Sequence, residues 1–127
     1  MSTTTIDVAQ VLSEIATLAE LNGENPFRTR AFANAARALE GTDADLETLA
    51  REDRLTELPG VGAGIAEVIR ELVETGRSEM HDELRTATPP GLFDLMRIPG
   101  LGTKRIHTLH AELGIDSLDA LERAVQD

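Results

Sequence analysis

The chain has 127 residues, of which 41% are hydrophobic, and it carries a formal net charge of −11 at pH 7. This length suits one compact unit or two small subdomains and is short for a multidomain enzyme. The absence of cysteine excludes zinc fingers, disulfide frameworks and thiol catalysis. No apolar stretch approaches the roughly 20 residues of a membrane span, so we expect a soluble, cytoplasmic protein with no membrane contact.

The acidic residues are unevenly distributed. Residues 25–39 contain three arginines and no carboxylate, and residues 95–111 contain Arg97, Lys104, Arg105 and again no carboxylate. These two acid-free segments hold six of the 12 basic residues and none of the 23 acidic ones. Because proteins that bind phosphates usually present a basic surface, these segments are where this acidic chain can present one.

Apolar residues recur with helical spacing along the first half of the chain. The first helix has Thr4 and Asp7 in capping-box spacing. A second helix begins after Asn25 with a first-turn proline and ends at Gly41. Asp45 is placed to cap a short third helix.

The second half continues in the same way. The helix that follows residues 58–62 closes at Gly76, and another opens at Ser78 and must end before the consecutive prolines at 89 and 90. A short helix is expected over residues 92–98, then one that runs to Gly114, and a last one from Ser117. No segment alternates with period two, so we predict an all-α helical bundle, divided into domains at residues 1–87 and 88–127.

An internal repeat is the main functional signal: Leu58-Pro59-Gly60-Val61-Gly62 and Ile98-Pro99-Gly100-Leu101-Gly102 share the pattern apolar-Pro-Gly-apolar-Gly. The proline ends the incoming helix, and the two glycines permit backbone angles that are closed to other residues. The next helix then starts with free amides beside glycines, which is a ready phosphate site that reads no bases. A single turn of this kind is equally typical of a plain helix-to-helix connection, but the repetition favours nucleic-acid binding.

Several segments in the same order resemble the N-terminal region of the family X DNA polymerases, which are related to DNA polymerase beta. The matching segments are residues 23–32, 58–67, 89–92, 97–105 and 113–118. The resemblance implies a fold of the SAM-like, DNA polymerase beta N-terminal type with two helix-hairpin-helix motifs. It implies that residues 1–87 form a lyase-like domain at the 5'-phosphate side of a gap, and that residues 88–127 bind the duplex.

The resemblance also implies site residues. The expected phosphate-binding residues are Gly60, Gly62, Gly64, Gly100, Gly102, Lys104 and Arg105, with Arg28 and Arg30 near the 5'-phosphate. For the two arginines a solvated helix face is an equal alternative. Each hairpin would hold a monovalent cation, Na⁺ or K⁺, through the backbone carbonyls of Thr56, Leu58 and Val61 and of Met96, Ile98 and Leu101, and no other cofactor is expected.

The residues needed for catalysis are missing. The family's two lyase lysine positions are Gly64 and Val68 here, and arginine cannot replace a lysine that must act as a neutral amine. The chain ends before the catalytic palm domain of the family, so we expect no enzyme activity. The D-x-D sequence at residues 43–45 fits a turn and helix cap better than a metal site, and His107 and His110 are expected to be solvated or to face phosphates.

The sequence therefore predicts a non-catalytic DNA-binding module that grips the phosphates of duplex or gapped DNA without sequence specificity. The second hairpin, next to Arg97, Lys104 and Arg105, is expected to bind better than the first. DNA repair, a protein partner in repair and a location at the nucleoid fit this role. The alternative is a protein-interaction module of the same helical fold, whose acidic surface meets a basic partner.

Overall fold

The computed structural model describes residues 5–126, and this part of the chain contains helices and no strand. The elements are α1 (Thr5–Leu21), α2 (Pro26–Glu40), α3 (Leu46–Arg51), the 3₁₀ helix η1 (Leu55–Glu57), α4 (Ala63–Thr75), α5 (Glu79–Ala87), α6 (Pro90–Leu95), α7 (Thr103–Leu113) and α8 (Leu118–Gln126). The predicted all-α fold is confirmed. The predicted cap at Thr4 lies outside the described residues.

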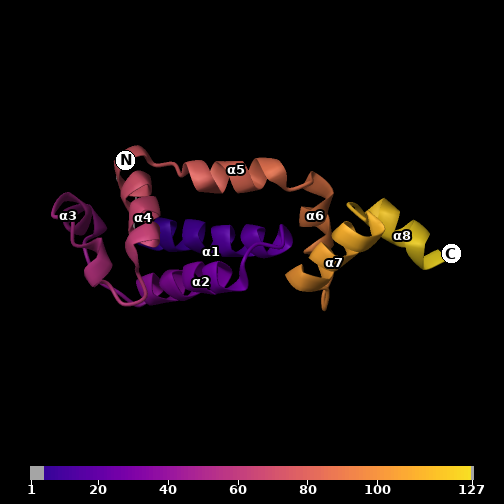
Figure 1. Cartoon of the computed structure of the whole chain (residues 1–127), viewed down its shortest axis with the longest axis horizontal. Helices are drawn as coiled ribbons and strands as arrows, with labels where there is room; N and C mark the ends of the chain where they lie inside the picture. Colours follow the sequence, from indigo (N-terminus) through magenta and orange to yellow (C-terminus); the bar gives the residue numbers. More distant parts are fainter. Residues whose placement is uncertain (1–4, 127) are drawn as a thin grey trace.

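The centre of the molecule is the pair α1 and α2, which lie side by side (Figure 1). At one end of this pair α4 crosses it, with α3 on the outside, and at the other end α6, α7 and α8 extend the structure. The core is aliphatic, as expected for a chain with few aromatic residues: Leu12, Ile15, Leu39, Ile69 and Ile106 are fully buried. Removal of such side chains from water is the main stabilising contribution to the fold.

Helix caps fall where the sequence places them. Asn25, Asp45, Ser78 and Ser117 each accept a hydrogen bond from a backbone amide at the start of α2, α3, α5 and α8 respectively. Gly41, Gly76 and Gly114 follow the ends of α2, α4 and α7. Such short-range signals decide these boundaries because the cap and the amide it satisfies lie within one turn of each other.

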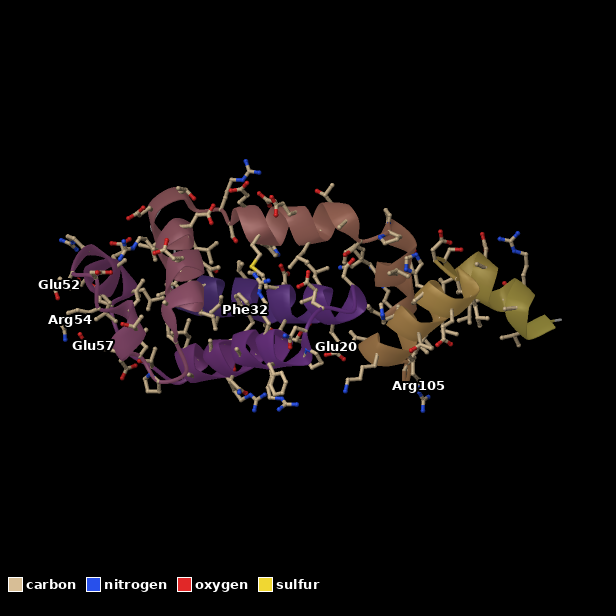
Figure 2. All side chains as sticks on the ribbon, in the orientation of Figure 1. Glu20, Phe32, Glu52, Arg54, Glu57 and Arg105 are labelled. Atoms are coloured by element: carbon tan, nitrogen blue, oxygen red, sulfur yellow. The ribbon has the colours of Figure 1, made fainter. Side chains whose placement is uncertain are left out.

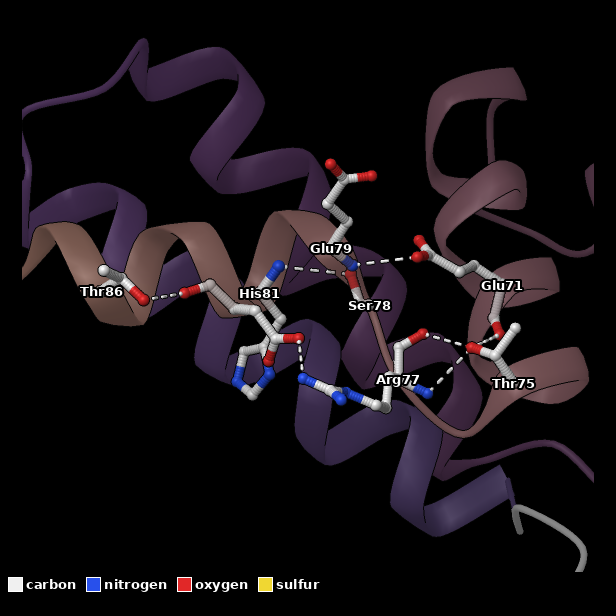
Figure 3. Close-up of polar contacts among 8 residues, drawn as sticks. Glu71, Thr75, Arg77, Ser78, Glu79, His81 and Thr86 are labelled. Atoms are coloured by element: carbon white, nitrogen blue, oxygen red, sulfur yellow. Dashed lines mark hydrogen bonds and ion pairs between the residues drawn. The ribbon is translucent and has the colours of Figure 1, made fainter.

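The connection between α4 and α5 is closed by polar contacts (Figure 3). The Thr75 hydroxyl donates to the Arg77 carbonyl at 3.0 Å and accepts from the Arg77 amide at 3.1 Å. The Glu79 amide donates to the Glu71 carboxylate at 3.0 Å. These bonds fix the direction in which α5 returns along α1.

The short helix before the second hairpin was predicted to begin at residue 92, and the structure shows that it begins at Pro90. Proline is favourable at the first helical position because its missing N–H has no intrahelical partner there. Gly91 then packs against the turn before α8. A Cβ on Gly91 would lie 1.8 Å from the Asp116 carbonyl oxygen, so only glycine fits.

Candidate nucleic-acid interface

The two hairpins have the same backbone. The Val61 amide donates to the Leu58 carbonyl at 3.1 Å, and the Leu101 amide donates to the Ile98 carbonyl at the same distance. Gly60 and Gly100 have φ values of +80° and +84°. A proline at the second position and a glycine with positive φ at the third are the requirements of a type II turn, so each hairpin is built on one.

The second glycine of each hairpin has a different role from the one predicted. Gly62 and Gly102 have φ values of −90° and −77°, which any residue adopts, so the expectation that both glycines need restricted angles is wrong for these two. An added Cβ would meet no protein atom within 4 Å at either position. The fold does not require glycine there, and its effect is to leave the start of the following helix uncovered.

The starts of α4 and α7 also lack the caps that other helices have. Gly62 and Gly102 are the N-cap residues, and neither helix start receives a side-chain hydrogen bond, in contrast to α2, α3 and α5. The first amides of a helix have no partner within it, and the helix dipole adds positive potential at that end. Each hairpin therefore presents unsatisfied donors to an anion, and Gly60, Gly62, Gly64, Gly100 and Gly102 are all exposed there.

The carbonyl groups that the sequence analysis assigns to a cation lie in the same two turns. Leu58 and Ile98 each accept one hydrogen bond from the turn amide, which leaves a second lone pair. Among the described residues no backbone hydrogen bond to the carbonyls of Thr56, Val61, Met96 or Leu101 occurs outside the helices. Oxygen donors of this kind suit a hard monovalent cation.

Both hairpins lie on one edge of the molecule. In the view of Figure 1 the turns that lead into α4 and α7 are at the lower edge, and α2 runs between them. The first acid-free segment, residues 25–39, contains α2 except for its last residue, Glu40, and the second, residues 95–111, contains the second hairpin and most of α7. The fold thus brings both segments to the edge that carries the hairpins.

The two arginines at the start of α2 do not act together. Arg28 lies 3.8 Å from the Glu24 carboxylate and donates to the Met80 sulfur at 3.5 Å, so it faces α5. Arg30 instead lines an open pocket together with Lys104 from α7. Only Arg30 therefore lines a pocket with a residue next to the second hairpin, and the 5'-phosphate contact of both arginines stays a prediction.

The side chains around the two hairpins differ. Arg97, Lys104 and Arg105 are exposed at the second hairpin, and none of them is within 4.0 Å of a carboxylate in the described part of the chain. Arg105 points away from the bundle at the lower edge of the view in Figure 2. The second hairpin thus combines free amides with free cations.

At the first hairpin the basic residue that is nearest in sequence, Arg54, is already paired with carboxylates. Arg54 donates through Nε to Glu57 at 2.9 Å and through Nη1 to Glu52 at 2.9 Å, and Figure 2 shows this group at the far end from α8. The hydrogen bond from Arg54 holds the pKa of Glu57 below its ordinary value, and Glu57 and Glu52 raise the pKa of Arg54. Two carboxylates share one guanidinium, so this group leaves a net negative charge next to Leu58.

A polar junction joins the second hairpin to α1. The Thr103 hydroxyl at the start of α7 donates to the Glu20 carboxylate. His107 Nδ1 lies 3.0 Å from the Leu21 carbonyl, and a Cβ on Gly23 would lie 2.4 Å from the His107 ring. The His107 ring is thus half-buried in this junction, and it also lines an open pocket beside Lys104, so its contact with a phosphate stays a prediction.

The two residues at the positions where the resemblance predicts lyase lysines lie in different surroundings. Gly64 is exposed in the first turn of α4 with open space around it, whereas Val68 is 8% exposed and belongs to the core.

Asp45, in the D-x-D sequence, caps α3, and its pKa is lowered mainly by the hydrogen bond from the Thr48 side chain. Among residues 5–126 no group of three histidine or acidic side chains is arranged to hold a metal ion.

The helix-hairpin-helix domain family matches residues 5–78, a range that contains the first hairpin. The chain belongs to the helix-hairpin-helix domain family. It is also similar to the DNA polymerase/3'-5' exonuclease PolX of Bacillus subtilis (strain 168), with 38% identity over 120 residues that include 94% of this chain and 20% of that protein. The resemblance to family X DNA polymerases is thereby confirmed, and this helix-hairpin-helix chain spans about a fifth of the length of that relative. In the described residues no helix is long and apolar enough to cross a membrane.

Proposed function

We propose that this chain is a non-catalytic, sequence-nonspecific DNA-binding module that contacts the phosphates of duplex or gapped DNA through its two hairpins. The observation that carries the proposal is the pair of uncapped helix starts, where glycine is not required by the fold and a Cβ would meet nothing. A phosphate oxygen is the ligand that satisfies several backbone amides at a helix start without a side chain. The second hairpin leads because Arg97, Lys104 and Arg105 add free positive charge.

The name of the similar protein, a DNA polymerase and 3'-5' exonuclease, supports a module that works on DNA. We propose that this module supplies DNA contact rather than chemistry, in DNA repair and at the nucleoid in the cytoplasm. A protein partner in repair would then supply the chemistry.

The proposal includes a lack of lyase activity. Schiff-base chemistry needs a lysine amine at the first hairpin, and Gly64 and Val68 occupy the positions where the family resemblance places it. Abasic-site DNA treated with borohydride should give no covalent adduct with this chain. An adduct would contradict this part of the proposal, and the only lysine that could form one is Lys104.

We further propose a Na⁺ or K⁺ ion at each hairpin, held by the carbonyls of residues 56, 58 and 61 and of residues 96, 98 and 101. The ion would bridge the turn to a DNA phosphate and offset part of the charge of the acidic chain. DNA affinity at fixed ionic strength should be higher in KCl or NaCl than in tetramethylammonium chloride, whose cation is too large for the turn. Equal affinities would remove the ion from the proposal.

The test of DNA binding is a comparison of single glycine variants. Gly102→Val places a branched side chain over the amides of the second hairpin and, given the open space, should cost about 1 kcal/mol of stability at most. We expect it to weaken binding to a short gapped duplex strongly, Gly62→Val to weaken it less, and Gly41→Ala, at the end of α2 and outside both hairpin sequences, to leave it unchanged. Fluorescence anisotropy measures the affinity, and indifference to Gly102→Val would refute binding through the second hairpin.

A further inference from the structure

An open pocket of about 660 Å³ lies where α1, the start of α2 and the first turns of α7 meet. It joins the two acid-free segments, because Arg30 comes from the first and Lys104 from the second. The small residues Ala16 and Ala33 leave space in the pocket, and the His107 ring, which packs against Gly23, also lines it. The volume is within the range of pockets that hold small organic groups.

The charges in the pocket cancel. Glu20 and Glu24 line it together with Arg30 and Lys104, so two carboxylates face two cations. A free phosphate gains no net attraction in such surroundings. A neutral group with both hydrogen-bond donors and acceptors can pair with the carboxylates and with the cations of this pocket. Carboxylates accept hydrogen bonds from the amino groups of nucleobases.

The polar groups of this pocket are available to a ligand. Glu20 accepts one hydrogen bond from Thr103 at the start of α7, and a carboxylate offers further lone pairs. Glu24 has only a long contact of 3.8 Å with Arg28 as an ion pair. Arg30 and Lys104 are exposed and have no carboxylate within 4.0 Å in the described chain.

The pocket adjoins the phosphate-binding end of α7. Lys104 lines the pocket and is also the second residue of α7, whose uncapped start forms the second hairpin's phosphate site. A phosphate bound there has its own nucleoside beside the pocket. A paired base is held in the duplex, whereas an unpaired base is free to turn out and enter.

We infer that this pocket holds an unpaired nucleobase whose neighbouring phosphate is bound by the second hairpin. This inference rests on the proposed function and adds to it the feature of DNA that the module prefers. The module thereby distinguishes a one-nucleotide gap, which contains an unpaired base, from a nick, which contains none.

Two DNA duplexes test the inference, one with a nick and one with a one-nucleotide gap at the same position. We expect the wild-type chain to bind the gapped duplex about tenfold more tightly in anisotropy titrations, the effect of one base that gains hydrogen bonds to charged groups. Ala33→Met fills the pocket from α2 and should abolish this preference while the affinity for the nicked duplex stays the same. Ala111→Met, on the exposed surface of α7, is the matched control and should keep it.

Thr17→Met fills the pocket from the opposite wall on α1 and should act like Ala33→Met, and circular dichroism melts establish that each variant is folded. Equal wild-type affinity for the two duplexes would overturn the inference, as would a preference that survives both filling variants or an equal loss on both duplexes. If the wild-type chain binds neither duplex, the proposed function itself fails.

Discussion

The two hairpins are equal in backbone and unequal in surroundings. Both have a type II turn, a glycine with positive φ and an uncapped helix start. The first has Arg54 engaged by two carboxylates and an empty surface at Gly64, whereas the second has free Lys104 and Arg105. The comparison teaches that the repeat sets the shape of a phosphate site, while the side chains near it set how strongly an acidic protein can use it.

The largest expected effect concerns how the second hairpin is held. Gly91→Ala places a methyl group into the Asp116 backbone and should lower the free energy of unfolding by roughly 3 kcal/mol, because neither side can give way cheaply. Gly64→Ala, the same change beside the first hairpin, should raise the free energy of unfolding by up to about 1 kcal/mol, because Gly64 is an exposed helical residue with open space around it. Urea denaturation measures both, and changes of the same sign would contradict this expectation.

The next effect concerns charge. Lys104→Ala with Arg105→Ala should weaken DNA binding about a hundredfold, roughly tenfold for each charged hydrogen bond that is removed. The slope of log affinity against log salt should become shallower by about 1.8, or 0.9 for each phosphate that the variant no longer neutralises. Arg28→Ala is the counterpart on α2 and should have a small effect because Arg28 faces α5 rather than the second hairpin. Equal effects would mean that the two regions share the binding evenly.

A smaller effect should follow from making the hairpins more alike. Gly64→Lys adds a cation to the first turn of α4, where a Cβ meets nothing, and should raise affinity severalfold with a slope steeper by about 0.9. Gly64→Gln is the uncharged control and should leave the slope unchanged. An unchanged affinity for Gly64→Lys would show that DNA does not reach the first hairpin.

The smallest effect concerns the carboxylates next to the first hairpin. Arg54→Ala should raise the pKa of Glu57 toward its ordinary value of 4.5, which NMR titration of the carboxyl carbon detects. Because the folded-state pKa is depressed, the ion pair stabilises the protein above the ordinary pKa, and this stabilisation disappears as the pH falls through the folded value. The wild-type chain should therefore lose stability in acid more steeply than the variant, and parallel curves would contradict this contribution.

Most helices and their ends were predictable from the sequence, because a cap and the amides that it satisfies are local, whereas α6, which has no side-chain cap, was predicted with the wrong bounds. Asn25, Asp45 and Ser78 show this directly. The surroundings of the site were not predictable in the same way. Arg28 and Arg30 are two residues apart in sequence, yet one faces α5 and the other the α7 pocket.

The junction at His107 depends on contacts that are distant in sequence. His107 meets Leu21 and Gly23 only because α7 packs on the end of α1. The one sequence feature that could have indicated this junction was Gly23, which lies in the segment that resembles the family X polymerases. Because Gly23 has no side chain, it leaves room for the His107 ring. Helical periodicity indicates which face is buried, but it does not indicate which neighbour covers it.

The uncapped starts of α4 and α7 also bear on motion. Amides without an intramolecular partner exchange their hydrogens with solvent quickly, and a first turn without a cap opens more readily than the rest of its helix. A bound phosphate would act as the missing cap for that turn. The starts of α4 and α7 are thus helix ends that DNA would order, so that binding and local folding become a single event.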